Sequence, residues 1–195
     1  MNLVEKAIGF ATKAHEGQVR KFGNIPYILH PLEVANIIAT ITPDQETIAA
    51  GVLHDTVEDC GVLPETIRKE FGPRVHALVS SETEDKLEDR PPADTWYERK
   101  RDSLIMLKLT KDRDAKILWL SDKLSNIRSF GRQYLISGDE MWNALHQNDP
   151  RMQKWYYTTI LKFLSEFDGT PAYLEYKNYV HFLFNDVEDA DVEEI

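Results

Sequence analysis

Apolar residues recur at the spacing of an α-helix through most of this 195-residue chain, and no segment sustains the alternation of a β-strand. In the first segment Leu3, Ala7 and Ala11 fall on one helical face, and Gly17 suits a helix C-terminus. The spacing predicts an amphipathic helix over residues 2–16. Continued along the chain, this pattern predicts an all-α fold, a single helical bundle of about eight to ten helices.

Prolines and short polar side chains mark where the helices begin. Pro31 has the position of a first helical residue. Ser137 and Glu140 have the spacing of a capping box near the start of a helix over residues 139–148. The charged segment 83–94, with two consecutive prolines, is predicted to be the least ordered internal part. Further helices are predicted over residues 45–60, 64–71, 73–81, 95–109, 114–130, 150–167 and 171–184.

The charge of the chain is unevenly distributed. It carries 23 Lys and Arg against 33 Asp and Glu residues, a formal net charge of −10. Six acidic residues and no basic ones lie in residues 186–195, which we expect to be a disordered acidic tail after one domain over residues 1–185. The acidic balance argues against binding to nucleic acid or to an anionic membrane. It does not argue against a small anionic substrate, because the charge of one pocket can differ from that of the whole surface.

Cysteine content and hydropathy indicate the compartment. Cys60 is the only cysteine, so neither an internal disulfide nor a thiolate zinc cage can form. No stretch approaches the roughly 20 apolar residues of a membrane-spanning helix, and the first residues carry charges where a signal peptide would be apolar. These features predict a cytoplasmic protein.

The sharpest local signal is the sequence HDTVED at residues 54–59, which follows the apolar segment IAAGVL. On a helix, His54 lies one turn before Glu58, and Asp55 lies one turn before Asp59. Three carboxylates this close repel one another in a low-dielectric interior. A bound divalent cation would relieve that repulsion and lower the pKa of each carboxyl group.

Two more candidate ligands lie in apolar surroundings. His30 stands between the sequence YIL and a proline, and Asp122 follows the sequence ILWLS. A buried carboxylate needs a partner. Together with His54 and Asp55, these residues make a set of two nitrogen and two carboxylate ligands with room for water, which suits Mn²⁺ or Fe²⁺ better than a closed structural zinc site.

Each of these residues also has a purely structural interpretation. The sequence HDxxED could be a charged helix end or a solvated face, and His30 could bind the backbone at a helix start. Asp122 could pair with Lys123 or with a nearby arginine. The order of the three motifs, RK…PYxxHP, then HDxxED, then SDKLSN, favours a functional site over separate structural roles.

This ordered set resembles the HD-domain hydrolases of the RelA/SpoT alarmone family from about residue 18 to residue 128. Segments 82–86 and 96–100 resemble its small, single-domain branch. The resemblance implies an all-helical HD domain that binds one divalent metal, usually Mn²⁺, and a catalytic pair at Glu58 and Asp59. The implied metal ligands are His30, His54, Asp55 and Asp122.

The resemblance also implies contacts with the substrate. Arg20 and Lys21 match a basic pair that meets the nucleotide, with the arginine against guanine. Asn126 matches a substrate-contacting asparagine, and Ser129 stands where a threonine is common. The residues themselves suggest further contacts, because Lys123 and Arg128 could add positive charge for an anionic nucleotide.

The implied reaction is hydrolysis of guanosine 3′,5′-bis(diphosphate) or its pentaphosphate to GDP or GTP and pyrophosphate. A second interpretation keeps the site and changes the substrate to another nucleotide, such as removal of the 2′-phosphate of NADPH, as in the metazoan SpoT-homologue hydrolase that the chain also resembles. In a third, the domain binds a nucleotide without turning it over. The sequence leaves the metal actually loaded and the oligomeric state open.

Overall fold

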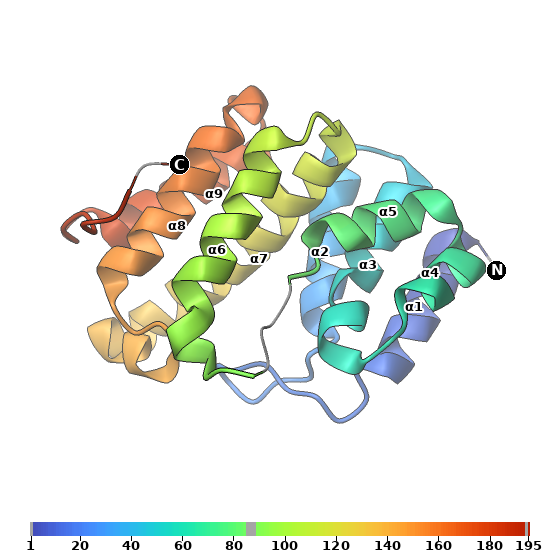
Figure 1. The fold of residues 1–195 in the computed structure, drawn as a ribbon, viewed down its shortest axis with the longest axis horizontal. Coiled ribbons are helices and arrows are strands. Elements are labelled where there is room, and N and C mark those ends of the chain that lie inside the picture. Colours follow the sequence, from blue (N-terminus) through green and yellow to red (C-terminus); the bar gives the residue numbers. More distant parts are fainter. Residues whose placement is uncertain (1, 85–88, 194) are drawn as a thin grey trace. The chain divides into compact units, whose positions relative to one another are not determined.

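The computed structural model describes residues 2–84, 89–193 and 195. Within these residues it contains nine α-helices and two short 3₁₀-helices, and no β-strand, so the all-α prediction is confirmed (Figure 1). The chain forms two compact units. The N-terminal unit comprises residues 2–83 and 111–125, and the C-terminal unit comprises the other described residues.

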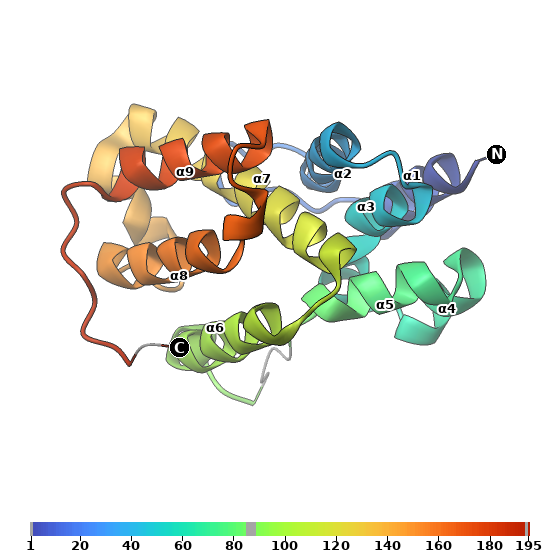
Figure 2. The same cartoon turned by 90° about the horizontal axis from the view of Figure 1, so that it is seen from above.

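The third helix is the centre of the N-terminal unit. It contacts the first, second and fifth helices along the chain (Figures 1 and 2). The helices of this unit are α1 (Leu3–Ala14), α2 (Leu29–Ile41), α3 (Gln45–Cys60), α4 (Pro64–Phe71), α5 (Pro73–Glu82) and the first part of α7 (Arg113–Ser137).

The ends and the packing of α3 follow from a few residues. The side chain of Asp44 accepts a hydrogen bond from the Thr47 amide at 2.8 Å and caps the helix start, and Gly61, with φ of 66°, ends it in the left-handed conformation. A side chain at Gly51 would overlap Ile38 of α2. The glycine therefore lets α2 approach α3 closely, and this approach brings the start of α2 next to the polar end of α3.

The C-terminal unit packs α8 against the helices on either side of it. Contacts join α8 to α6 and to α9. Aromatic rings fill much of the interior, and the ring of Tyr157 lies near those of Tyr176 and Phe184. Its elements are α6 (Pro92–Leu109), the rest of α7, η1 (Gly138–Ala144), α8 (Pro150–Phe163), η2 (Ser165–Phe167) and α9 (Pro171–Phe184).

Several predicted boundaries are wrong. The α-helix predicted over residues 139–148 is instead the short 3₁₀-helix η1, because α7 continues to Ser137. The Ser137 hydroxyl donates to the Gln133 carbonyl oxygen rather than capping a new helix. Helix α2 begins two residues before Pro31. Helix α6 begins inside the segment 83–94, of which residues 85–88 lie outside the described part of the chain.

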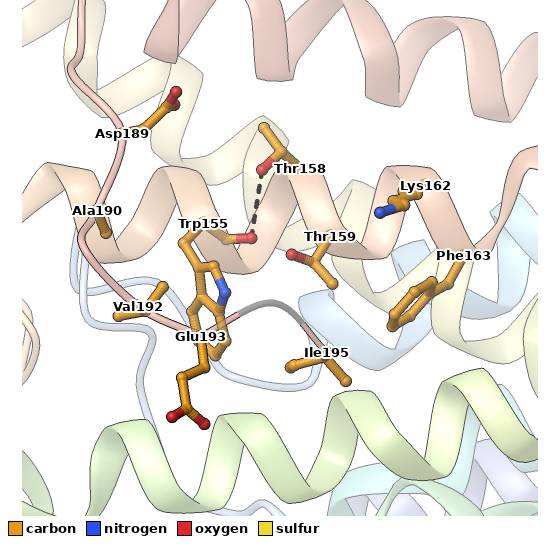
Figure 3. A pocket seen from close by; sticks show the side chains of 10 residues that line it. All are labelled: Trp155, Thr158, Thr159, Lys162, Phe163, Asp189, Ala190, Val192, Glu193 and Ile195. Carbon is orange, nitrogen blue, oxygen red and sulfur yellow. Dashed lines mark hydrogen bonds between the residues drawn. The ribbon is translucent and has the colours of Figure 1, made fainter.

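The described part of the acidic tail lies along α8. Lys154 Nζ donates to the Val187 carbonyl oxygen at 2.6 Å and pairs with Asp189 at 2.7 Å. A pocket of about 410 Å³ is lined by α8 residues, Trp155 among them, and by tail residues (Figure 3). None of the predicted site residues lines this pocket. The division into a domain over residues 1–185 and a disordered tail stays a prediction. Among the described residues, no helix combines the length and the apolar composition needed to span a membrane.

Candidate metal centre and active site

Three helices of the N-terminal unit bring the four predicted ligands together. His30 lies in the first turn of α2, and Asp122 lies in α7. His54 and Asp55 are neighbours in α3. The apolar residues before His54 and Asp122 pack in the core, whereas Leu29, directly before His30, is 50% exposed, and His30 is enclosed with the buried residues that follow it in α2. As a result His30, His54 and Asp122 are only 4%, 3% and 4% exposed.

The imidazole nitrogens and carboxylate oxygens of this cluster face one another. His30 Nε2 lies 3.0 Å from Asp122 Oδ1 and 3.5 Å from Asp55 Oδ2. His54 Nε2 lies 3.1 Å from Asp55 Oδ2 and 3.5 Å from Asp122 Oδ1. The possible ligand atoms of His30, His54 and Asp122 all lie within 4.8 Å of one another. A single cation could therefore contact these three residues, and Asp55 Oδ2 lies beside both imidazoles.

The orientation of the two imidazoles fits a divalent cation. His54 Nδ1 lies 2.8 Å from the Gly51 carbonyl oxygen, which can only accept, so this nitrogen carries the proton. Its Nε2 is buried 3.1 Å from Asp55 Oδ2 and makes no hydrogen bond of good geometry among the described residues. His30 Nδ1 likewise has an outer partner, the hydroxyl of Ser125 at 2.9 Å. Metal-bound histidines have this arrangement, with one nitrogen held by an outer group and the other directed at the metal.

Burial and charge oppose each other in the cluster. Burial lowers the pKa of His30, and the Asp122 and Asp55 carboxylates offset this effect only in part. Burial also lowers the pKa of His54, but the same two carboxylates outweigh it and hold the pKa well above its ordinary value. Burial raises the pKa of Asp122, but Lys123 and the two imidazoles outweigh it and hold the pKa well below its ordinary value. Without a cation, the cluster therefore holds a proton at His54.

A tyrosine connects this cluster to the predicted catalytic pair. The Tyr27 hydroxyl donates to Asp55 Oδ2 at 2.8 Å and lies 3.1 Å from Asp59 Oδ2. Burial, followed by the charges of Asp55 and Asp59, raises the pKa of Tyr27, so the phenol stays protonated and can donate. Asp59 is exposed and Glu58 is half-buried, one helical turn after His54. Both carboxylates of the predicted pair thus lie on the turn of α3 that follows the ligands.

The predicted substrate contacts of the N-terminal unit have different surroundings. The Arg20 guanidinium lies 5.5 Å from the centre of the Tyr27 ring, and Lys21 is exposed. Lys123 contacts the Asp122 carboxylate and lies 4.7 Å from the centre of the Trp119 ring. The structural alternative for Asp122, a pair with Lys123, is therefore present together with the two histidine contacts.

The other predicted substrate contacts lie in the C-terminal unit. Asn126 and Ser129 continue α7 beyond the part that belongs to the N-terminal unit, and both are half-buried. Their roles stay predictions. Arg128, beside them in sequence, pairs with Glu175 of α9 through contacts of 2.6 Å and 2.7 Å. That arginine thus forms an ion pair inside its own unit.

Some residues near the cluster were not predicted from the sequence. Ser125 and Glu33 lie behind His30, where the Ser125 hydroxyl donates to Glu33 Oε2 at 2.8 Å. Glu82, the last residue of α5, has a buried Oε1 without a hydrogen-bond partner among the described residues, and burial raises its pKa to about 8. In the sequence Glu82 opens the acidic segment ETEDK and looks like a surface residue. Only the packing of the helices distinguishes these residues from solvated ones.

We expect the binding of a divalent cation to strengthen as the pH rises. Because the pKa of His54 is higher in the folded protein than in the unfolded chain, its ion pairs stabilise the metal-free fold fully below about pH 6.5 and are lost as the pH rises through the folded pKa. The cation must displace this proton, so its affinity should rise by roughly tenfold per pH unit below that pKa. Thermal unfolding with and without Mn²⁺ should show a larger stabilisation at about pH 8 than at about pH 6. Equal stabilisation at both pH values would contradict this expectation.

Comparison with known proteins shows which family the chain resembles. Residues 7–137, which include every predicted site residue, match the family model described as HD domain. The guanosine-3′,5′-bis(diphosphate) 3′-pyrophosphohydrolase of Vibrio cholerae is 38% identical over 122 residues, which are 62% of this chain and 17% of that protein. The GTP pyrophosphokinase of Streptomyces coelicolor is 39% identical over 127 residues, 65% of this chain and 14% of that protein. The chain thus spans only a small part of the length of these curated relatives.

Two solved structures are similar over most of their length. One, described as a metazoan ortholog of SpoT that hydrolyses ppGpp, has a TM-score of 0.72 and 25% identity, with 93% of this chain and 96% of that chain covered. The other, lmo0812 from Listeria monocytogenes, has a TM-score of 0.70 and 30% identity, with 80% of this chain and 99% of that chain covered. The family model and these relatives agree with the resemblance seen in the sequence: the chain belongs to the HD-domain family.

Proposed function

We propose that this protein is a metal-dependent hydrolase that converts guanosine 3′,5′-bis(diphosphate), or its pentaphosphate, to GDP or GTP and pyrophosphate. The observation that carries the proposal is the Tyr27 hydroxyl, which joins Asp55 of the ligand cluster to Asp59 of the carboxylate pair. The names of the Vibrio cholerae relative and of the metazoan structure, both of which refer to hydrolysis of this nucleotide, support the substrate.

In this proposal His30, His54, Asp55 and Asp122 hold one divalent cation. Mn²⁺ is the proposed ion, because two imidazoles and two carboxylates form a mixed donor set that leaves positions for water. When bound, the cation supplies positive charge that stabilises the attacked phosphate and eases the ionisation of water. Lys123 contacts the Asp122 carboxylate and compensates part of its negative charge.

The carboxylate pair performs the proton transfers. Glu58, one turn after His54, accepts a proton from the attacking water, whose oxygen bonds to the phosphorus on the 3′ oxygen. The bond between that phosphorus and the 3′ oxygen breaks, pyrophosphate leaves, and the 3′ oxygen takes up a proton. Asp59 either orients the water or helps to deliver this proton. The Tyr27 hydroxyl lies 3.1 Å from Asp59 Oδ2 and can donate its single proton to Asp59 in place of Asp55.

The proposed substrate contacts are cations and polar groups. Arg20 offers the flat face of its guanidinium to guanine, and Lys21 offers an exposed ammonium group to the phosphates. Lys123, Asn126 and Ser129 complete the proposed contacts. We further propose that residues 1–185 form the HD domain ahead of an acidic tail, and that the protein acts on a small nucleotide in the cytoplasm rather than on nucleic acid or a membrane.

Product analysis tests the proposed reaction. The Mn²⁺-loaded protein, incubated with a panel of nucleotides and separated by anion-exchange chromatography, should convert the alarmone to GDP and pyrophosphate and lose this activity after chelation. Release of orthophosphate from NADPH with an intact alarmone would instead indicate the phosphatase. Binding of the alarmone without any turnover would indicate a non-catalytic module, and either outcome contradicts the proposal.

A further inference from the structure

Ser125 and Glu33 form a hydrogen-bonded pair behind His30, outside the four proposed ligands. Ser125 Oγ lies 2.9 Å from His30 Nδ1, and its hydroxyl donates to Glu33 Oε2 at 2.8 Å. Ser125 is 1% exposed and stands three residues after Asp122 in α7, whereas Glu33 stands three residues after His30 in α2. The pair therefore joins two of the helices that supply the proposed ligands.

The number of protons fixes the direction of these hydrogen bonds. An ionised carboxylate only accepts, so the single hydroxyl proton of Ser125 goes to Glu33. The serine oxygen is then an acceptor toward His30, and the neutral imidazole must carry its proton on Nδ1. The lone pair of His30 in this tautomer lies on Nε2. The carboxylates of Asp122, at 3.0 Å, and Asp55, at 3.5 Å, would accept a proton from Nε2 in the other tautomer, so the outer pair acts against them.

The two histidines depend on different kinds of outer partner. His54 is oriented by the main-chain carbonyl of Gly51 within its own helix, an acceptor that is present whatever the side chains around it. His30 is oriented by two side chains, one of which comes from another helix. The direction of the His30 lone pair therefore depends on Ser125 and Glu33.

We propose that Glu33 and Ser125 are positioning residues that hold His30 in the tautomer with a free Nε2, directed toward the cation. The inference rests on the proposed metal centre. Without the pair, some of the folded molecules would have a proton on Nε2 or a rotated His30 ring, and these molecules could not bind the cation. The apparent affinity falls in proportion to the fraction of molecules that keep a free Nε2. Loss of such an outer partner typically weakens metal binding by about 10-fold to 100-fold.

Two measurements on a small set of variants test the proposal. The first is the tautomer of His30 in the neutral, metal-free protein, read from its ¹⁵N NMR spectrum, and the second is Mn²⁺ affinity by calorimetry. Ser125→Ala should mix the two tautomers and weaken Mn²⁺ binding by about 10-fold to 100-fold. Ser121→Ala is the matched control, because Ser121 is a buried serine one turn earlier in α7 whose hydroxyl donates to the Ile117 carbonyl oxygen at 2.8 Å. It should resemble the wild-type protein in both measurements.

Substitutions of Glu33 provide the same test without altering Ser125. Glu33→Ala frees the Ser125 hydroxyl to donate to Nδ1, so the tautomer protonated on Nε2 should increase and Mn²⁺ affinity should fall. Glu33→Gln keeps an acceptor oxygen and should restore most of both properties.

Unchanged tautomer and affinity in Ser125→Ala and Glu33→Ala, whatever their stability, would overturn the proposal. If the wild-type protein itself binds no Mn²⁺, the metal centre and the proposed function fail. The His30 tautomer then still decides whether the pair orients this ring.

Discussion

Asp122→Asn is expected to weaken Mn²⁺ binding by more than about 100-fold, beyond the loss typical of an outer partner, and to remove hydrolysis with it. Asp122 Oδ1 lies 3.0 Å from His30 Nε2 and 3.5 Å from His54 Nε2, so this oxygen, like Asp55 Oδ2, lies close to both imidazoles. Asparagine keeps the shape of the side chain but lacks the charge that a divalent cation requires. Calorimetric titration with Mn²⁺, together with thermal unfolding with and without the ion, measures this effect.

The control for this variant is Asp114→Asn. Asp114 lies in the first turn of the same helix and pairs with Arg74 at 2.6 Å, with a side chain that is 33% exposed. The same chemical change there should leave Mn²⁺ affinity within about twofold of the wild-type value, because a partly exposed ion pair contributes little. Unchanged Mn²⁺ binding by a folded Asp122→Asn protein would contradict the proposed ligand set.

Glu58→Gln is expected to lower kcat for alarmone hydrolysis by about 10²-fold to 10⁴-fold, the range typical of a lost general base. The amide cannot accept the proton of the attacking water, but Glu58 is not a proposed ligand, so Mn²⁺ affinity should change by less than about threefold. Steady-state assays at saturating Mn²⁺ measure the activity, and calorimetry measures the affinity.

The matched control for this variant is Glu65→Gln in α4, where the side chain is 76% exposed. It should retain full activity and full Mn²⁺ binding. Two results would contradict the role given to Glu58: wild-type turnover by Glu58→Gln, or a loss of activity that is entirely explained by lost Mn²⁺ binding. The first result would exclude Glu58 as the general base, and the second would indicate that Glu58 is a metal ligand.

Helices whose local signals have one interpretation could be predicted from the sequence, and a segment whose signals have two interpretations could not. The helix predicted over residues 45–60 has these ends in the structure, because Asp44 caps its start and Gly61 ends it. The helix predicted over residues 139–148 failed because Ser137 has two interpretations in the sequence. It is the last residue of α7, followed by Gly138 with φ of 54°, and its hydroxyl donates to the Gln133 carbonyl oxygen instead of capping a new helix.

Much of the candidate site could also be anticipated, because His54 and Asp122 directly follow apolar helical segments that pack in the core. The structure brings His30, His54, Asp55 and Asp122 within 3.0 Å to 3.5 Å of one another in pairs, as the ligand hypothesis requires. Their role as ligands stays a prediction, as do the roles of the substrate contacts.

The contacts that Tyr27, Ser125 and Glu33 make with the site could not be predicted from the sequence. Tyr27 is 28 residues from Asp55, and Glu33 is 92 residues from Ser125. No periodicity links positions so far apart, because their meeting depends on how α2, α3 and α7 pack. Ser125 lies inside the motif SDKLSN, but nothing in the sequence shows that its hydroxyl contacts His30 and Glu33.

The central claim is that two histidines and two aspartates of the N-terminal unit hold the cation that supports hydrolysis. An anomalous difference map from a Mn²⁺-soaked crystal, recorded at the manganese absorption edge, tests it most directly. The account predicts one peak bounded by His30 Nε2, His54 Nε2 and the carboxylates of Asp55 and Asp122, at about 2.0 Å to 2.3 Å from the ligand atoms. A crystal of protein that hydrolyses the alarmone but shows its manganese peak elsewhere, or none at this cluster, would contradict the account.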